Sequence, residues 1–110
     1  MPISQDLLHI APELRFWAQR TICVRRLWIF GSRVRGEHQP ESDLDIAIEI
    51  DPTEADVTAV LAYLSNFEHW RSELQQSVPY EVDLEIYDPA HVIVKQGVDS
   101  HGFLVYERGP

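Results

Sequence analysis

Apolar residues recur with two different periods along the chain, and these periods predict where its strands and helices lie. Side chains on a strand alternate between two faces, and alternating or short continuous apolar runs predict strands over 24–30, 43–50, 80–87 and 103–107. Apolar residues near helical spacing predict helices over 12–21, 53–77 and 89–96. The resulting order of elements is typical of a compact α/β sheet domain.

Proline, glycine and polar residues set the expected ends of these elements. Pro12 is favoured in a first helical turn and disfavoured inside a helix, so residues 4–10 are expected to form a separate turn or short helix. Pro89 and Gly97 are the expected start and stop of the last helix. Shorter signals predict a short helix over 32–35, a loop over 36–42, a capping box at 53–56 and a candidate break of the long helix at 65–66.

Length and composition restrict the class of protein. At 110 residues the chain is long enough for one independent core and too short for two, so residues 1–110 are predicted to be a single domain. The one cysteine, Cys23, excludes an internal disulfide framework and a cysteine-based zinc site. No stretch approaches the roughly 20 apolar residues of a membrane span, and the N-terminus does not resemble a signal peptide. We therefore expect a cytoplasmic protein that binds no membrane.

The charges are unevenly distributed along the chain. The formal net charge of −9 argues against extended binding to a nucleic-acid backbone. Six of the nine basic residues precede residue 36, whereas Glu37 to Asp88 contains fourteen acids and one base. Two interpretations are open. The acids could form an ordinary solvated surface, or a basic patch for a triphosphate could lie beside an acidic metal-binding face.

One stretch, residues 28–50, combines a turn with a pair of acids. It reads WIFGSRVRGEHQPESDLDIAIEI, so ten residues separate Gly31-Ser32 from Asp43-Leu44-Asp45. Asp43 and Asp45 project from the same face of the predicted strand, where two adjacent carboxylates repel each other unless a cation lies between them. A Gly-Ser turn offers backbone N–H groups and a hydroxyl that suit a phosphate.

A third acid follows on the next predicted strand. In VDLEI, Asp83 and Glu85 alternate with apolar residues. If the two strands are neighbours, the carboxylates of Asp43, Asp45 and Asp83 converge, and with phosphate and water oxygens they would satisfy Mg²⁺. Each piece alone is also common in solvated strands and ordinary turns. The Gly-Ser and Asp-x-Asp pair at one fixed spacing should arise by chance in only about one such chain per thousand.

These residues carry a resemblance to a known family. GSRVRG followed by ESDLDIAI resembles the signature of the minimal nucleotidyltransferases (MNT) of the DNA polymerase beta superfamily. The resemblance extends to VDLEIY and to the closing VIVKQGVDSHGFLVYE. It implies a nucleotidyltransferase fold, which is a small mixed sheet of about four strands flanked by helices.

The resemblance also implies roles for individual residues. Asp43 and Asp45 would bind two Mg²⁺ ions, and Asp83 would bind one of them and deprotonate the attacking hydroxyl. The triphosphate of ATP would be held by Gly31 and Ser32, with Arg33 as a further phosphate contact. The roles of Arg35, His38 and Glu85 stay open.

Small members of this family are commonly paired with a helical HEPN protein as antitoxin and toxin. The resemblance therefore implies transfer of AMP from ATP to a hydroxyl, most simply a tyrosine, of such a partner. Two alternatives remain: a non-catalytic subunit that neutralises its partner by binding, and the catalytic chain of a two-chain enzyme with a small-molecule or nucleic-acid acceptor. The nucleobase and the state of homo- or hetero-oligomerisation are open.

Overall fold

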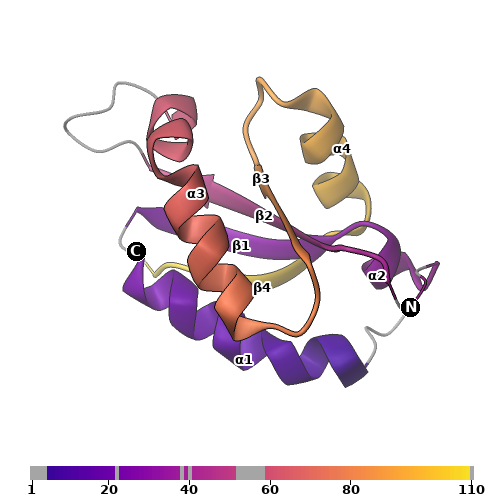
Figure 1. Ribbon diagram of the computed structural model, residues 1–110. Helices are drawn as coiled ribbons and strands as arrows, with labels where there is room; N and C mark the ends of the chain where they lie inside the picture. The colour runs from indigo at the N-terminus through magenta and orange to yellow at the C-terminus, as the bar shows by residue number, and fades with distance from the viewer. Residues whose placement is uncertain (1–4, 22, 38, 40, 52–58, 110) are drawn as a thin grey trace.

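The structure is a computed structural model that describes residues 5–21, 23–37, 39, 41–51 and 59–109. Within these residues the chain forms four helices and four strands (Figure 1). In chain order they are α1 (Gln5–Arg20), β1 (Val24–Phe30), α2 (Ser32–Arg35), β2 (Leu44–Ile50), α3 (Ala59–Ser77), β3 (Val82–Ile86), α4 (Val92–His101) and β4 (Phe103–Glu107).

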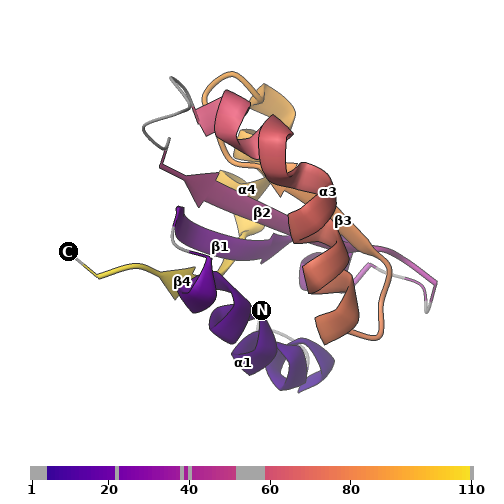
Figure 2. The same ribbon diagram turned by 60° about the vertical axis from the view of Figure 1, so that its left-hand side comes forward.

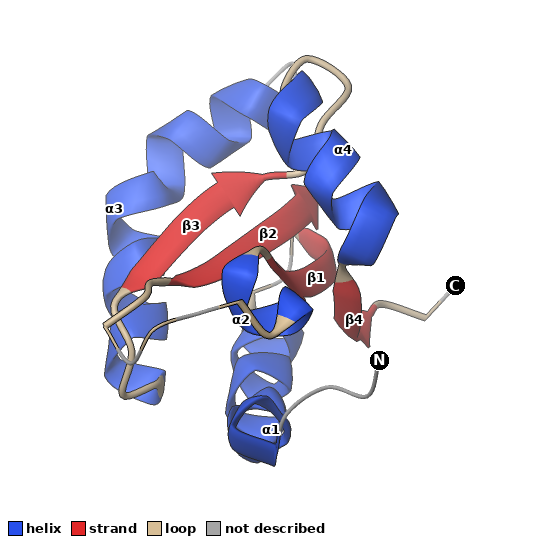
Figure 3. Ribbon diagram, turned by 90° about the vertical axis from the view of Figure 1, so that its right-hand side faces the viewer, coloured by secondary structure: helices blue, strands red, loops and turns tan. Residues whose placement is uncertain are grey.

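The four strands form one mixed sheet in the order β3-β2-β1-β4. β1 is antiparallel to both β2 and β4, whereas β2 and β3 run parallel (Figure 3). The predicted small mixed sheet flanked by helices is confirmed. The parallel pairing has one direct consequence for function, because it sets the starts of β2 and β3, with their acidic residues, side by side.

Helices cover both faces of the sheet. α1 and α3 lie on one face and α4 lies on the other (Figures 1 and 2). The main core lies between the sheet and helices α1 and α3, and it includes Leu14, Trp17, Leu27, Ile46 and Leu84. Each fully buried side chain of this size contributes about 1.5–3 kcal/mol. A smaller cluster under α4 joins Val94 and Val98 to Ala47, packed against Trp28, Phe30 and Tyr87.

The first helix differs from the prediction, because α1 runs without interruption from Gln5 to Arg20 with Pro12 inside it. The expected separation of residues 4–10 from the main helix, as a turn or a short helix of their own, is wrong. A proline removes the hydrogen bond to the carbonyl four residues earlier, here that of Leu8, and both Leu8 and Pro12 face solvent. Apolar residues on either side of the proline, among them Leu7 and Leu14, are buried in the main core. Their burial offsets the lost hydrogen bond.

The last helix also differs from the prediction of 89–96. Asp88 caps a turn, with its carbonyl accepting from His91 N–H and its carboxylate from Ala90 N–H, so Pro89 lies before the helix. The helix passes through Gly97 and ends at His101. A Cβ at position 97 would lie 3.3 Å from Cδ2 of Phe30. Gly97 therefore allows α4 to pack closely on the sheet, at a helix-propensity cost of about 1 kcal/mol.

The long helix is confirmed from Ala59 to Ser77, while its predicted start and the capping box at 53–56 lie outside the described residues. The candidate break at Ser65-Asn66 is not observed. Both side chains donate to carbonyls one turn earlier, Ser65 to Leu61 and Asn66 to Ala62, so these polar groups are satisfied within the helix. Among the described residues, no helix is long and apolar enough to cross a membrane.

Candidate active site

The parallel pair β2-β3 places two of the predicted acids next to each other. Asp45 and Asp83 are partners in the register of the two strands, and both are half-buried on the face opposite the main core. Asp43 lies just before β2 and is exposed. The side-chain alternation predicted for these strands is confirmed, since Leu44, Ile46 and Leu84 are buried in the main core.

The carboxylate of Asp45 is held in an electrostatically unfavourable place. Burial, which penalises a charged carboxylate, is the main cause that raises the pKa of Asp45 to about 6. The charge of Asp83 and a hydrogen bond with it come next, followed by the charges of Asp43 and Glu85. Acidic groups from two strands thus accumulate around one half-buried carboxyl group, which is the electrostatic environment that a cation relieves.

Carboxylate oxygens are suitable ligands for Mg²⁺, which usually completes its octahedron with water and substrate phosphate. As the side chains stand, no group of three His, Cys, Asp or Glu residues within the described part of the chain is arranged to hold a metal ion. The chemistry of the donor set fits Mg²⁺ nonetheless. It supplies carboxylate oxygens alone, and the half-buried carboxylate of Asp45 lies among like charges that a cation would neutralise.

Gly31 brings the Gly-Ser turn into contact with the Asp-x-Asp pair. It follows β1 with φ 82° and ψ −159°, a conformation that residues with a Cβ rarely adopt. A Cβ added there would collide with Oδ2 of Asp45 and lie 2.9 Å from its Cγ. The Asp45 carboxylate therefore lies directly against the backbone of the turn. Gly31 and Asp45 are thus in contact, although they lie on either side of the segment that separates the Gly-Ser turn from the acid pair.

Ser32 begins α2, the short helix after this turn. The carbonyl of Gly31 accepts hydrogen bonds from the N–H groups of Val34 and Arg35, both at 3.1 Å. The side chain of Ser32 is half-buried and makes no hydrogen bond to any described residue. The backbone of the turn is thus fixed, and Ser32 directly follows Gly31, whose backbone lies against the Asp45 carboxylate.

Arg33 has a structural task that the sequence did not reveal. It is the one charged residue buried among the described residues, at 4% exposure. Its Nε and Nη2 donate to the carbonyl of Ser42 at 3.0 and 2.8 Å, and its guanidinium lies 4.0 Å from the centre of the Tyr80 ring. Arg33 thereby holds the residue before Asp43 in place. Its contact with a triphosphate stays a prediction.

His101 is a residue of the site that sequence reasoning missed. Its Nε2 accepts a hydrogen bond from the Gly31 N–H at 2.9 Å and lies 3.3 Å from Nη1 of Arg35. Burial, and then the charge of Arg35, lower the pKa of His101, which favours the neutral ring that this hydrogen bond requires. The signal in the sequence was positional, because a residue just before a strand paired with β1 must lie near the end of β1.

Glu85 also acquires a partner. It lies two residues beyond Asp83 on β3, and its Oε2 is 3.2 Å from Nε2 of His91. Burial and the charge of Asp83 raise the pKa of Glu85, whereas His91 acts in the opposite direction. The acidic face of β3 therefore continues as far as the start of α4. His38, a loop residue of open role, lies outside the described residues.

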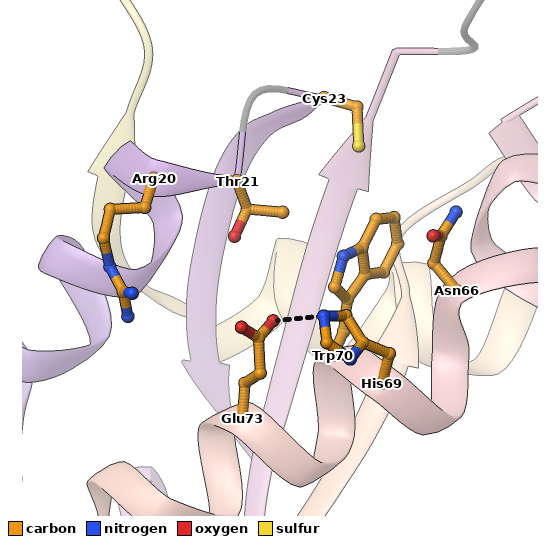
Figure 4. A pocket seen from close by; sticks show the side chains of 7 residues that line it. All are labelled: Arg20, Thr21, Cys23, Asn66, His69, Trp70 and Glu73. Carbon is orange, nitrogen blue, oxygen red and sulfur yellow. Dashed lines mark ion pairs between the residues drawn. The ribbon is translucent and has the colours of Figure 1, made fainter.

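One pocket of the described residues lies elsewhere, between α1 and α3 (Figure 4). It has a volume of about 340 Å³ and is lined by Arg20, Thr21, Cys23, Asn66, His69, Trp70 and Glu73. Glu73 is already engaged, since its Oε1 accepts from Trp17 Nε1 at 3.3 Å and lies 3.5 Å from His69 Nε2. None of the predicted site residues lines this pocket, so the acidic face remains the candidate active site.

The fold and the site can now be compared with known proteins. Three solved structures with a similar fold are toxin–antitoxin complexes. One, with AMP-PNP, has a TM-score of 0.68 at 20% identity, covering 89% of this chain and 73% of that chain. An MntA-HepT complex has a TM-score of 0.63 at 17% identity, with 92% and 73% covered. A tri-AMPylated Shewanella oneidensis HEPN toxin in complex with MNT antitoxin has a TM-score of 0.63 at 17% identity, with 92% and 72% covered.

These identities establish a shared fold and nothing finer. No curated protein sequence matches the chain. The evidence for the family comes from the sequence, because the model of the family described as "Polymerase beta, Nucleotidyltransferase" matches residues 14–110. The match includes the Gly-Ser turn, the Asp-x-Asp pair and Asp83, and it extends beyond them over most of the chain. The chain belongs to the polymerase beta nucleotidyltransferase family.

Proposed function

We propose that this protein transfers AMP from ATP to a hydroxyl group in a Mg²⁺-dependent reaction. One observation carries the proposal: the carboxylate of Asp45 lies beside Asp83 and also against the backbone of Gly31. The carboxylate proposed to bind a metal is thereby adjacent both to a second carboxylate and to the turn that would hold phosphate. Nucleotidyl transfer needs this combination, since charge on the phosphates must be neutralised while the attacking oxygen is positioned.

The residues divide the reaction between them. Gly31 and Ser32 hold the triphosphate, and Asp43, Asp45 and Asp83 are the ligands that would hold two Mg²⁺ ions. The acceptor oxygen forms a bond to the α-phosphorus, the bond from that phosphorus to the bridging oxygen breaks, and pyrophosphate leaves. Asp83 receives the proton of the acceptor hydroxyl. Bound Mg²⁺ would polarise the phosphoryl group and stabilise the leaving pyrophosphate.

The acceptor in this proposal is a tyrosine of a helical HEPN partner, and the protein acts as its antitoxin. Support comes from the three complexes of similar fold, one of which contains an AMPylated HEPN toxin with its MNT antitoxin. The negative net charge of the chain, formally −9, also disfavours a long nucleic-acid acceptor.

The test is transfer of label from [α-³²P]ATP to the protein encoded beside this one, with Mg²⁺ present. The wild type is expected to label the partner, and Asp83→Asn is expected to lose at least a hundredfold in rate. Glu49→Gln is the matched control, because Glu49 lies on β2 but pairs with Arg26, at 2.6 Å, away from the proposed ligands. Neutralisation of the partner by Asp83→Asn without any label would instead favour inhibition by binding. Label in a small molecule or tRNA would change the acceptor.

A further inference from the structure

The hydrogen bond between His101 and Gly31 joins the end of α4 to the turn at the candidate active site. The donor is the backbone N–H of Gly31, the acceptor is Nε2 of His101, and the two residues are 70 positions apart in the chain. The predicted roles of the site residues do not include this histidine.

The fold fixes where His101 lies. Phe103, at the start of β4, pairs with Ile29 near the end of β1, so the chain just before β4 must lie near the end of β1, which Gly31 follows. Gly102 joins α4 to β4 directly, donating its N–H to the carbonyl of Val98 at 2.8 Å. Gly97 lets α4 approach β1, and a Cβ at Gly97 would lie 3.7 Å from Cε1 of the His101 ring. The position of the imidazole is therefore set by the Gly97 backbone one turn earlier and by the Gly102 connection that follows it.

His101 orients the peptide group that precedes the turn. The other backbone groups of Gly31 are engaged as well, since its carbonyl accepts from Val34 and Arg35 and its Cα faces the carboxylate of Asp45. Fixing the N–H therefore fixes a residue whose conformation admits glycine alone. It also directs this N–H toward α4, so Gly31 contributes to triphosphate binding through the shape of the turn, and Ser32 contributes its hydroxyl.

We propose that His101 is a positioning residue of the nucleotide site: it holds the Gly31-Ser32 turn in the conformation that receives the triphosphate. This inference rests on the proposed function for its substrate. Burial, and then the charge of Arg35, whose guanidinium Nη1 lies 3.3 Å from the same ring nitrogen, lower the pKa of His101 and keep the ring neutral. The ring therefore stays an acceptor, and the turn stays attached to α4.

Three variants test the proposal. His101→Ala removes the acceptor, whereas His101→Gln supplies an amide oxygen at nearly the position of Nε2. His9→Ala is the matched control, since His9 is an exposed histidine of α1. One net hydrogen bond corresponds to roughly a two- to tenfold effect on an equilibrium. His101→Ala is thus expected to raise the Kd of ATP with Mg²⁺, measured by calorimetry, and the KM of AMP transfer by about that factor. His101→Gln and His9→Ala should stay within about twofold of the wild type.

A merely structural role would give a different result. Loss of folded protein lowers the active fraction and the apparent kcat but leaves KM and Kd unchanged, so equal Kd values for wild type and His101→Ala would overturn the proposal. Failure of His101→Gln to restore affinity, with a native circular dichroism spectrum, would overturn it as well. If the wild type binds ATP but labels no partner, the proposed acceptor fails while the affinity comparison still decides the role of His101. A wild type that binds no ATP refutes both.

Discussion

Replacing Asp45 by asparagine should stabilise the protein in the absence of metal at neutral pH. Asparagine has nearly the same shape, can still donate a hydrogen bond to Asp83, and removes the charge that the site disfavours. The pKa of Asp45 is raised to about 6, above the ordinary aspartate value of about 3.9. The folded state therefore holds the proton more tightly than the unfolded state. Its stability falls as the pH rises from about 4 to about 6 and stays reduced above that.

The size of the effect follows from the same two values. A difference of about two pKa units corresponds to about 3 kcal/mol at about 1.4 kcal/mol per unit. Asp45 is only half-buried, and solvent screening lowers the part due to neighbouring charges, so we expect about 1–2 kcal/mol. With an unfolding entropy of about 2.1 cal/mol/K per residue, a chain of 110 residues would gain about 4–9 °C in Tm.

The assay is urea unfolding of wild type and Asp45→Asn between pH 4 and pH 8, in EDTA. The two curves should coincide near pH 4 and separate by pH 7, with the variant more stable. Addition of Mg²⁺ with ATP should stabilise the wild type and have little effect on the variant. Glu49→Gln is the control. It removes a charge from the same face of β2, but Glu49 pairs with Arg26, so no stabilisation is expected. An Asp45→Asn protein no more stable than wild type at pH 7 would refute the electrostatic reasoning.

Two further substitutions test the backbone of the site. Gly31→Ala should lower the free energy of unfolding by about 1–2 kcal/mol or more, which is the cost of a Cβ in a left-handed conformation. It should also abolish ATP binding, because the added Cβ displaces the Asp45 carboxylate. A normal ATP affinity in calorimetry would contradict this. Arg33→Lys should lower the unfolding free energy by about 1.5–3 kcal/mol, because lysine cannot make both hydrogen bonds to the Ser42 carbonyl. Urea unfolding measures this change in free energy. The control Arg35→Lys, at an exposed position, should have a much smaller effect.

Local patterns in the sequence were sufficient to predict the strands and the face on which each acid lies. A strand has a period of two, so the burial of Leu44 and Ile46 determines that Asp45 points to the other face. The same reasoning places Asp83. Their adjacency then needed only the assumption that β2 and β3 are neighbours, and the register that pairs Asp45 with Asp83 confirms it.

Contacts between distant segments were beyond the reach of these patterns. Pro12 is a poor helix residue, and the helix continues through it because residues on both sides of it are buried, where α1 packs against β1, α3 and β4. The local sequence around Gly97 likewise predicts the end of a helix, whereas in the fold this glycine lies inside α4 and allows it to pack closely on Phe30. The hydrogen bond of His101 depends on β4 pairing with β1 and on Gly102. Helix propensities and local spacing contain no information about such pairings.

The cost of the acidic cluster and the affinity of the site for a cation have one origin. The backbone around Gly31 is fixed by α2, β2 and α4, so the turn cannot move away to let Asp45 reach more water. The carboxylate remains half-buried among like charges. This placement lowers the free energy of unfolding of the unliganded protein, and a cation that neutralises the cluster removes that destabilisation and thereby binds more tightly. Ligand affinity and apo-state stability should consequently change in opposite directions whenever a substitution alters the charge at Asp45.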